Sequence, residues 1–226
     1  LMIFLEKNNS PLKLPLGFDK WLLDLVAIAT VGDIVPLVSE NRLLVKYGLL
    51  VLEKTKNLGL KKMLEKINNR SGKFDSEYLG WRLAPRLNAA GRVNQASVAF
   101  NLLTRANEEE AIKWAEVLET NNRERQEITE KILNQAFEQV GEVSEETKFL
   151  IVGGEGWPAG ILGLVAGRLC DKFQRPTLVF TEETIDNEKK YVASGRSLDE
   201  FDITAALKEC HDLILLYGGH PQACGL

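Results

Sequence analysis

The sequence has few of the residues that build metal centres and disulfide frameworks. Its 226 residues include two histidines, His211 and His220, and three cysteines, Cys170, Cys210 and Cys224. The cysteines are odd in number and far apart, so neither a disulfide framework nor a zinc ribbon is indicated. Two histidines cannot form a His-rich metal centre, so a metal site needs carboxylates or residues from elsewhere. We expect a reducing, cytoplasmic location.

Long apolar runs are also missing. No stretch approaches the roughly 18–20 apolar residues that cross a membrane, and the opening LMIFLEKNNS lacks the features of a secretory signal. Hydrophobic residues at 45% and charged residues at 27% fit a soluble globular protein of one or two domains. A net charge of −4 argues mildly against general DNA affinity but is compatible with a local basic cleft. The chain begins at Leu1 and stops soon after a Gly-Gly-His, so we expect a piece of a longer protein.

The first hundred residues have helical patterns. Apolar spacing predicts a largely buried helix that begins at Phe18 and ends near Gly32. Asn41 is predicted to cap a second helix. A basic amphipathic segment follows over residues 54–69, and residues 96–104, ASVAFNLLT, predict one or two more helical turns.

The middle of the chain predicts a long helix. Asn107 can cap it, and three glutamates fill its first turn, where the helix dipole favours acids. Residues 108–140 contain neither proline nor glycine, and residues 119–127, ETNNRERQE, contain no apolar side chain. One continuous helix of this length, about 50 Å at ~1.5 Å per residue, would connect two domains. The alternative is two helices broken near Asn121 and Asn122.

Short buried strands alternate with helices after Gly141. Pro158 suits the first turn of a helix over AGILGLVAGRLCDKF, and Asp202 can cap a helix over ITAALKEC. Trp157 either stacks on a base or covers the core, and we favour the core. This alternation predicts an α/β domain. The predicted strands are residues 148–154, 176–181 and 190–195.

Three arginines lie in GWRLAPRLNAAGR: Arg82, Arg86 and Arg92. Guanidinium forks suit bidentate phosphate contacts, and the small neighbouring residues allow a ligand to approach the backbone. The alternative is a structural loop whose arginines pair with acids.

A single aspartate, Asp33, follows a glycine at the end of the first predicted helix, in ATVGDIVP. A carboxylate held at the end of a rigid buried element is a good metal ligand or general base. A turn aspartate that bonds its own backbone is the simpler interpretation of these residues alone.

Two further motifs lie near the C-terminus. Ser194, Gly195, Arg196 and Ser197 leave a strand end and predict either an anion-binding nest or an ordinary polar turn. His220 follows two glycines and can donate to a phosphate or act as an acid or base, although a lone histidine is weak evidence. His211 is more simply a residue at a helix C-terminus.

The order of these motifs is more informative than any one of them. From about Trp21 to Leu226, the chain resembles the RecJ family of single-strand-specific DNA exonucleases, within the DHH phosphoesterase superfamily. APRLNAAGR is the most specific piece, whereas SGRS and GGH are shared more widely. The motifs occur in this order: ATVGDIVPL, ENRLLVKYGL, RLAPRLNAAGR, NRERQEI, GWPAGILGLVAGRL, SGRS and GGH.

The resemblance implies an α/β protein in three parts. Residues 1–106 would be the C-terminal helical part of a DHH catalytic domain, and 107–141 a connector helix. Residues 142–226 would be a DHH-associated, substrate-binding domain with a mixed sheet, truncated at its C-terminus. The family's activity is 5′-to-3′ hydrolysis of single-stranded DNA with two Mn²⁺ or Mg²⁺ ions, in repair and recombination.

The resemblance also implies site residues. Asp33 matches the family's last metal-ligating aspartate, in its TVAD motif, with Gly32 replacing alanine. Asp33 and His220 would be catalytic, and the substrate-binding residues divide among three motifs. These are Arg86, Asn88 and Arg92 on the DNA and phosphate side of the cleft, Ser194, Gly195, Arg196 and Ser197 at the terminal phosphate, and Gly218 and Gly219 before the histidine.

The family's upstream Asp-x-Asp and Asp-His-His motifs are not found in this sequence. Asp33 alone cannot hold two divalent ions, so we expect no stably bound metal and no activity from this chain, although its parent would be a nuclease. Expected partners are single-stranded DNA and repair or single-strand-binding proteins, with a monomeric chain and no membrane. The alternatives are a phosphodiesterase for short oligonucleotides or cyclic dinucleotides, and a non-catalytic nucleic-acid-binding module or scaffold.

Overall fold

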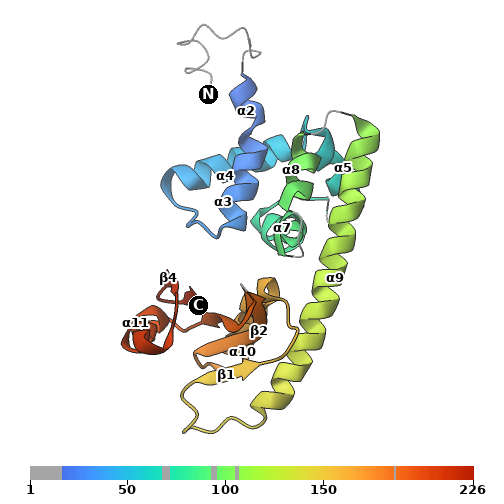
Figure 1. The fold of residues 1–226 in the computed structure, drawn as a ribbon. Coiled ribbons are helices and arrows are strands. Elements are labelled where there is room, and N and C mark those ends of the chain that lie inside the picture. The colour runs from blue at the N-terminus through green and yellow to red at the C-terminus, as the bar shows by residue number, and fades with distance from the viewer. Residues whose placement is uncertain (1–16, 68–71, 93–95, 105–106, 186) are drawn as a thin grey trace, which may run out of the picture. The chain divides into compact units, whose positions relative to one another are not determined.

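The computed structural model describes residues 17–67, 72–92, 96–104, 107–185 and 187–226. The chain forms two compact units, Leu1–Asn122 and Arg123–Leu226, called here the first and second units (Figure 1). One helix, α9, runs from the first unit into the second. The domain boundaries given above stay a prediction. Among the described residues, no helix combines the length and apolar character needed to cross a membrane.

The first unit is helical. Its core contains large, fully buried side chains from α4, α5, η1, α8 and α9, such as Leu52, Met63, Leu83, Leu102 and Leu118. The elements before α9 are α2 (Phe18–Trp21), α3 (Leu23–Gly32), α4 (Ser39–Leu52), α5 (Leu58–Ile67), α6 (Ser76–Tyr78), the π-helical turn η1 (Leu79–Leu83), α7 (Ala84–Arg92) and α8 (Ala96–Thr104).

Two details of the first unit differ from the prediction. The helix predicted from Phe18 is divided into α2 and α3 at Leu22. Asn41 does not cap α4, because the helix begins at Ser39 and its N-cap is Val38. The Asn41 side chain instead donates to the carbonyl of Pro36, at 3.2 Å, and so binds the turn that precedes the helix.

Helix α9 spans Glu108–Val140 without interruption, which confirms the predicted continuous helix and shows that the break at Asn121 and Asn122 is wrong. The predicted cap at Asn107 is confirmed: its Oδ1 accepts the Glu110 N–H at 2.8 Å, while its Nδ2 donates to Glu110 Oε2 at 2.7 Å. The polar middle is not uniformly solvated, because Asn122 is only 1% exposed.

The second unit is built on a mixed five-stranded sheet, as expected for the fold class. The strand order is β1-β2-β3-β5-β4, in which β1 pairs with β2 in parallel and all other pairs are antiparallel. The strands are β1 (Leu150–Gly153), β2 (Thr177–Ile185), β3 (Glu188–Arg196), β4 (Gly218–His220) and β5 (Ala223–Gly225), and the helices are α10 (Ala159–Phe173), α11 (Ile203–Glu209) and η2 (His211–Leu213).

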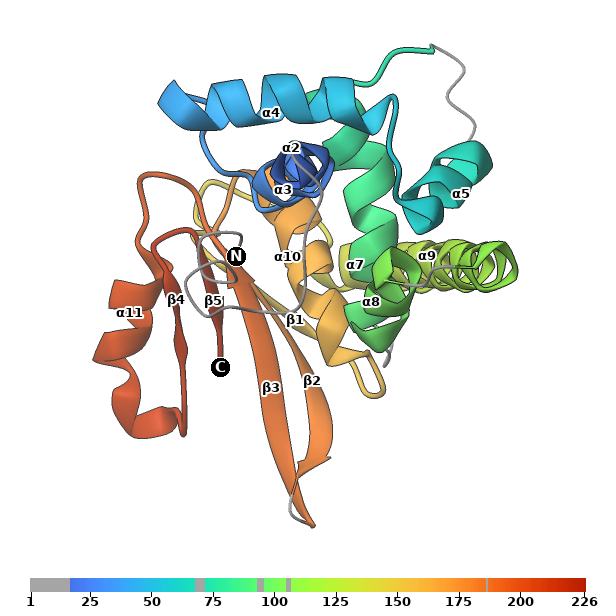
Figure 2. The same cartoon turned by 90° about the horizontal axis from the view of Figure 1, so that it is seen from above.

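Strands β2 and β3 form a longer hairpin than the apolar pattern predicts (Figure 2). The additional residues at its tip are largely polar, and the Lys189 ammonium pairs with the Glu182 carboxylate across it at 2.6 Å. An apolar pattern cannot detect a strand whose two faces are both solvated. The two predicted strands of this hairpin therefore stop short of its tip.

Helix α10 covers one sheet face and forms a core with the C-terminal turns of α9, through residues such as Leu162, Leu169 and Leu133. Pro158 is the N-cap of α10 and not its first helical residue. Trp157 is 7% exposed and donates to Gln135 Oε1 at 3.0 Å, which confirms that it covers the core.

The opposite sheet face carries α11. Asp202 caps this helix as predicted, because its Oδ1 accepts the Ala205 N–H at 2.9 Å. Ile203, the first residue of α11, is buried and lies close to Gly195 of β3.

Candidate functional site

Asp33 lies at the C-terminal end of α3. Its main-chain N–H donates to the carbonyl of Ala29 at 3.0 Å, but its exposed carboxylate has no partner within the described part of the chain. Ile34 has a φ of 56°, a left-handed conformation that costs a β-branched residue about 1–2 kcal/mol. Main-chain N–H groups of Asp33, Ile34 and Val35 close the turn, and the Asp33 carboxylate is available to a ligand.

The end of α3 packs against the arginine-rich segment. A Cβ built on Gly32 would lie 3.3 Å from Ala84 Cβ, at the start of α7, so the two elements approach closely there. Among the described residues, no three His, Cys, Asp or Glu side chains form a group able to hold a metal ion. The described donors therefore do not fit a two-metal site.

Residues 79–92 are helical, so the structural loop of the alternative interpretation is wrong, although its pairing of an arginine with an acid is found. Pro85 has no N–H and its ring is incompatible with a regular bond to the carbonyl four residues earlier, which explains the π-helical turn immediately before it. In this turn the N–H of Ala84 reaches the carbonyl of Leu79, five residues back. Arg86 Nη1 donates to the carbonyl of Arg82 at 2.7 Å.

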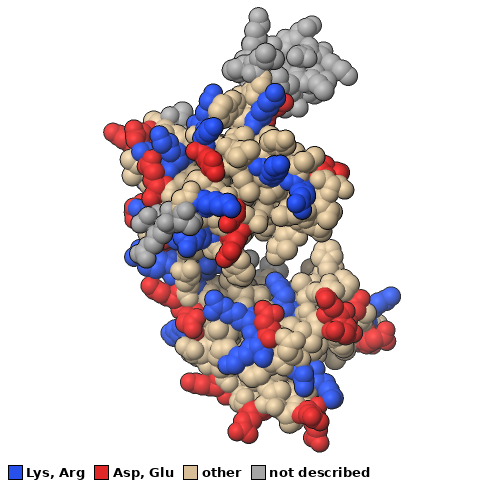
Figure 3. All heavy atoms as spheres, turned by 180° about the vertical axis from the view of Figure 1, so that it is seen from behind, with Lys and Arg blue, Asp and Glu red and all other residues tan. Residues whose placement is uncertain are grey.

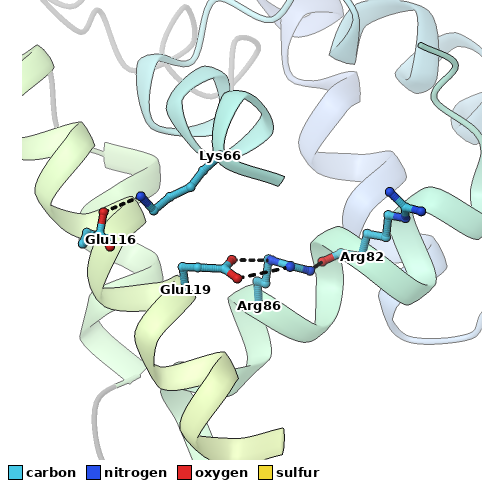
Figure 4. Close-up of polar contacts among 5 residues, drawn as sticks. All are labelled: Lys66, Arg82, Arg86, Glu116 and Glu119. Atoms are coloured by element: carbon cyan, nitrogen blue, oxygen red, sulfur yellow. Dashed lines mark hydrogen bonds and ion pairs between the residues drawn. The ribbon is translucent and has the colours of Figure 1, made fainter. Parts of the chain in front are cut away.

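Arg86 pairs with a carboxylate, as the alternative interpretation of this motif expects. Its Nε donates to Glu119 Oε2 at 2.6 Å, and its Nη2 to Glu119 Oε1 at 3.3 Å (Figure 4). The two side chains are only 19% and 20% exposed. Arg82 and Asn88 are exposed, and Arg82 has no ion pair in the described part of the chain. The side chain of Arg92 lies outside what the structure describes.

The motif SGRS lies at the end of β3 in the second unit. Arg196 Nη1 donates to the carbonyl of Gly195 at 2.7 Å and to Ser194 Oγ at 3.4 Å, and Ser194 Oγ donates to the carbonyl of Cys224 at 3.3 Å. Ser197 Oγ donates to the carbonyl of Phe201 at 2.6 Å and is used by the turn itself. Within the described residues, Arg196 has no carboxylate partner.

The strand register places His220 on the same sheet face as Arg196. Ala223 of β5 pairs with Arg196 of β3 on one side and with His220 of β4 on the other. Residues directly opposite one another in antiparallel strands point to the same face, so Ser194, two residues before Arg196, shares it. The main chains of Arg196 and His220 are two strand spacings apart, roughly 10 Å.

This face is the one covered by α10. A Cβ built on Gly163, in the second turn of α10, would lie 2.9 Å from Arg196 Nη2 and 3.0 Å from Ser194 Oγ. Ser194 and Arg196 therefore lie against the side of α10 at Gly163, the fifth of its 15 residues. His220 is exposed. The fold thus places one guanidinium and one hydroxyl against α10, on the sheet face that also carries the imidazole of His220.

The glycines of the predicted site have packing roles. A Cβ on Gly195 would lie 2.5 Å from Cys224 Sγ, and Gly219 has a φ of 152° with the carbonyl of Ala223 only 2.2 Å from its built Cβ. A Cβ on Gly218 would meet nothing within 4 Å. Burial raises the pKa of the Cys224 thiol, which stays protonated at neutral pH and is no nucleophile.

Two other features bear on ligand binding. Lys and Arg are interspersed with Asp and Glu over the face seen in Figure 3, consistent with a small net charge. An apolar cavity of about 830 Å³ in the second unit lies between Lys189–Val192 and Leu213–Gly218. Of the predicted site residues only Gly218 lines it, so the polar site described above is separate from it.

Sequence reasoning missed Glu119 and Gly163. Glu119 lies 33 residues from Arg86 within a stretch interpreted as solvated, and no local signal marks it as a partner. Gly163 and Gly167, four residues apart in one helix, carry a signal that was available, because small residues at this spacing allow another element to approach closely.

Comparisons with known proteins agree with these motifs. Residues 146–226 match the DHHA1 domain family. The chain is 40% identical over 206 residues to the single-stranded-DNA-specific exonuclease RecJ of Bacillus subtilis, covering 91% of this chain and 26% of that protein. It is 35% identical to Escherichia coli RecJ over 215 residues, covering 91% and 37%.

Solved structures give the same result. RecJ from Thermus thermophilus in complex with Mn²⁺ matches with a TM-score of 0.84 and 29% identity, over 100% of this chain and 32% of that one. An exonuclease RecJ bound to manganese matches with a TM-score of 0.77 and 30% identity, over 53% of its length. The chain spans about a quarter to two fifths of its curated relatives. The resemblance to the RecJ family is thereby confirmed.

Proposed function

We propose that this chain is the strand-holding part of a RecJ-type enzyme, a single-stranded-DNA-specific exonuclease that hydrolyses phosphodiesters from the 5′ end. One observation carries the proposal. Ser194 and Arg196 lie against the N-terminal half of α10, on the sheet face that also carries His220. A terminal phosphate is the natural ligand for this arrangement, because a guanidinium and a hydroxyl both donate hydrogen bonds to an anion.

Three residues of the second unit, Ser194, Arg196 and His220, would contact the DNA strand. Within the described residues Arg196 keeps unpaired N–H groups, because Gly195 and Ser194 accept only from its Nη1. These groups would bind phosphate oxygens, and the Ser194 hydroxyl would add a neutral hydrogen bond. His220, without a charged partner in the described residues, would donate a hydrogen bond to the same strand.

The first unit would contribute a second contact and one metal ligand. Arg86 would bind a phosphate along the strand, with the exposed Asn88 and, from the motif, Arg92 beside it. Asp33 would supply one carboxylate to the two metal ions, Mn²⁺ or Mg²⁺, and relatives have been solved with each. The other ligands would have to come from residues beyond those described.

The wider role is also part of the proposal. We place the parent enzyme in the cytoplasm, as a monomer acting in DNA repair and recombination beside single-strand-binding proteins. Three free cysteines, of which Cys170 and Cys224 are buried, fit a reducing compartment.

The binding test uses this chain with labelled oligonucleotides. A 5′-phosphorylated single strand is expected to bind about tenfold more tightly than the same strand with a 5′-hydroxyl, the value of one charge-assisted contact. Duplex DNA of the same length is the control. Equal binding of both 5′ ends would contradict the proposal, and preference for dinucleotides over longer strands would favour the small phosphodiesterase.

The activity test adds Mn²⁺ to the chain with 5′-labelled single-stranded DNA. We expect no degradation, because Asp33 is the one metal ligand that the motifs assign. Processive digestion by this chain would show that its own residues complete the metal site.

A further inference from the structure

The pair formed by Arg86 and Glu119 differs from an ordinary surface ion pair. Both oxygens of the carboxylate accept from Arg86, through Nε and Nη2, and both side chains are largely buried. Such a bidentate arrangement fixes the plane of the guanidinium as well as its position. Glu116 lies one turn before Glu119 on α9. It forms a single ion-pair contact with Lys66 of α5, and its side chain is 61% exposed (Figure 4).

A count of donors shows what the pair leaves available. A guanidinium has five N–H groups. Glu119 accepts two of them and the carbonyl of Arg82 accepts a third, from Nη1. Within the described residues two remain, one on each terminal nitrogen. Two N–H groups on adjacent nitrogens match the spacing of two phosphate oxygens.

The carbonyl of Arg82 adds a constraint set by the backbone. It lies in the π-helical turn that precedes Pro85, and Arg86 holds it with a side-chain hydrogen bond. The guanidinium is therefore fixed from two sides, by its own helix segment and by α9. A side chain held in this way does not lose further rotamer freedom when a ligand binds.

We propose that Glu119 is a positioning residue: it holds Arg86 so that the remaining N–H groups are presented to a phosphate of the DNA strand. This inference rests on the proposed function, since the phosphate is that of the strand. It also gives an expectation opposite in sign to simple electrostatics. Removal of a negative charge near DNA should strengthen binding by charge alone, whereas the loss of a positioning residue should weaken it.

The test compares two variants with the same change of charge. Glu119→Gln is expected to bind a single-stranded oligonucleotide about three- to tenfold more weakly than the unaltered chain. Glu116→Gln, on the same helix, is expected to bind equally well or slightly more tightly. In an Arg86→Ala background, Glu119→Gln should have no further weakening effect. Equal or tighter binding by Glu119→Gln would overturn the inference.

A second measurement does not depend on DNA. The Arg86 Nε–Hε group should give a slowly exchanging NMR cross-peak in the unaltered chain and in Glu116→Gln, and should lose it in Glu119→Gln. Thermal unfolding of each variant shows whether the fold is kept. If no strand binds to the unaltered chain, the proposed function fails, and the cross-peak alone decides: its loss in Glu119→Gln supports the positioning, and its persistence overturns it.

Discussion

Arg86 in the first unit and Arg196 in the second are both proposed phosphate ligands, but the fold holds them by different means. Arg86 is fixed by a carboxylate, so its charge is largely offset before any ligand arrives. Arg196 is held by neutral oxygens, those of Ser194 and Gly195, and keeps its full charge beside the N-terminal half of α10. One residue type therefore supplies a rigid fork in one place and an electrostatic anchor in another.

The second unit depends on packing that leaves no room for a side chain at Gly195. Gly195→Ala places a Cβ 2.5 Å from Cys224 Sγ and 2.7 Å from Ile203 Cδ1, both within packed structure. We expect a loss of about 1–3 kcal/mol in the free energy of unfolding, the usual cost of overpacking. Urea denaturation measures it, and faster labelling of the buried Cys224 thiol would accompany it.

Gly218→Ala is the matched control, because its new methyl group would meet nothing within 4 Å. Its unfolding free energy should stay within about 0.5 kcal/mol of the unaltered chain. Equal destabilisation by the two substitutions would mean that the close contact at Gly195 is not what fixes its identity.

The two arginines should respond differently to truncation. Arg196→Ala is expected to weaken binding of a 5′-phosphorylated strand about ten- to hundredfold and to abolish the preference for the phosphate, since a charge-assisted contact is lost. Arg86→Ala should weaken phosphorylated and unphosphorylated strands alike. Fluorescence titrations over a range of salt concentrations measure both, and each variant should have a shallower salt dependence. If both variants lose the preference for a 5′-phosphate equally, the two arginines do not have the different roles proposed here.

A smaller effect is expected from a substitution in α10 that disturbs the phosphate site but leaves the fold intact. Gly163→Ala directs a methyl group at the ends of two flexible side chains, Arg196 and Ser194, at 2.9 and 3.0 Å. These can move, so the melting temperature should change little, whereas affinity for the phosphorylated strand should fall several-fold. Gly167→Ala, whose Cβ would lie 3.9 Å from Arg196 Cγ, is the control and should bind normally. If Gly163→Ala binds the phosphorylated strand with unchanged affinity, α10 is not part of the phosphate site.

The smallest expected effect compares two helix caps. Hydrogen bonds from the Thr204 hydroxyl and from the Ala205 N–H lower the pKa of Asp202 below its ordinary 3.8. The stabilisation of α11 by this cap is therefore complete above that pH and is lost as the pH falls through the lowered pKa. Asn107, which caps α9, does not titrate.

Amide exchange of α11 against pH tests the Asp202 cap. Acid should increase exchange in α11 before it does so in the first turn of α9, and Asp202→Asn, which keeps a capping side chain, should remove this pH dependence. Asp199→Asn, at an exposed site nearby, should leave it intact. Acid-induced exchange that persists in Asp202→Asn would assign the effect to another group.

Local patterns predicted a good part of this fold. The absence of proline and glycine over residues 108–140, with Asn107 before them, was sufficient for α9, because helix formation depends on neighbours three and four residues apart. Apolar strands and their alternation with helices predicted the α/β unit. Where patterns were weak, the prediction was wrong: Asn41 resembles a cap but binds Pro36, and the tip of the β2–β3 hairpin has no apolar signal.

The sequence by itself determined the element types, the fold class and the motifs that indicate a RecJ-type protein, since each is carried by residues close together in the chain. Only the tertiary structure decided that Arg86 meets Glu119, 33 residues away, that Gly163 makes room for Arg196, and that Arg196 and His220 share a sheet face. These relations depend on register and on helix packing. A strand shifted by one residue reverses its faces, and no local pattern contains that information.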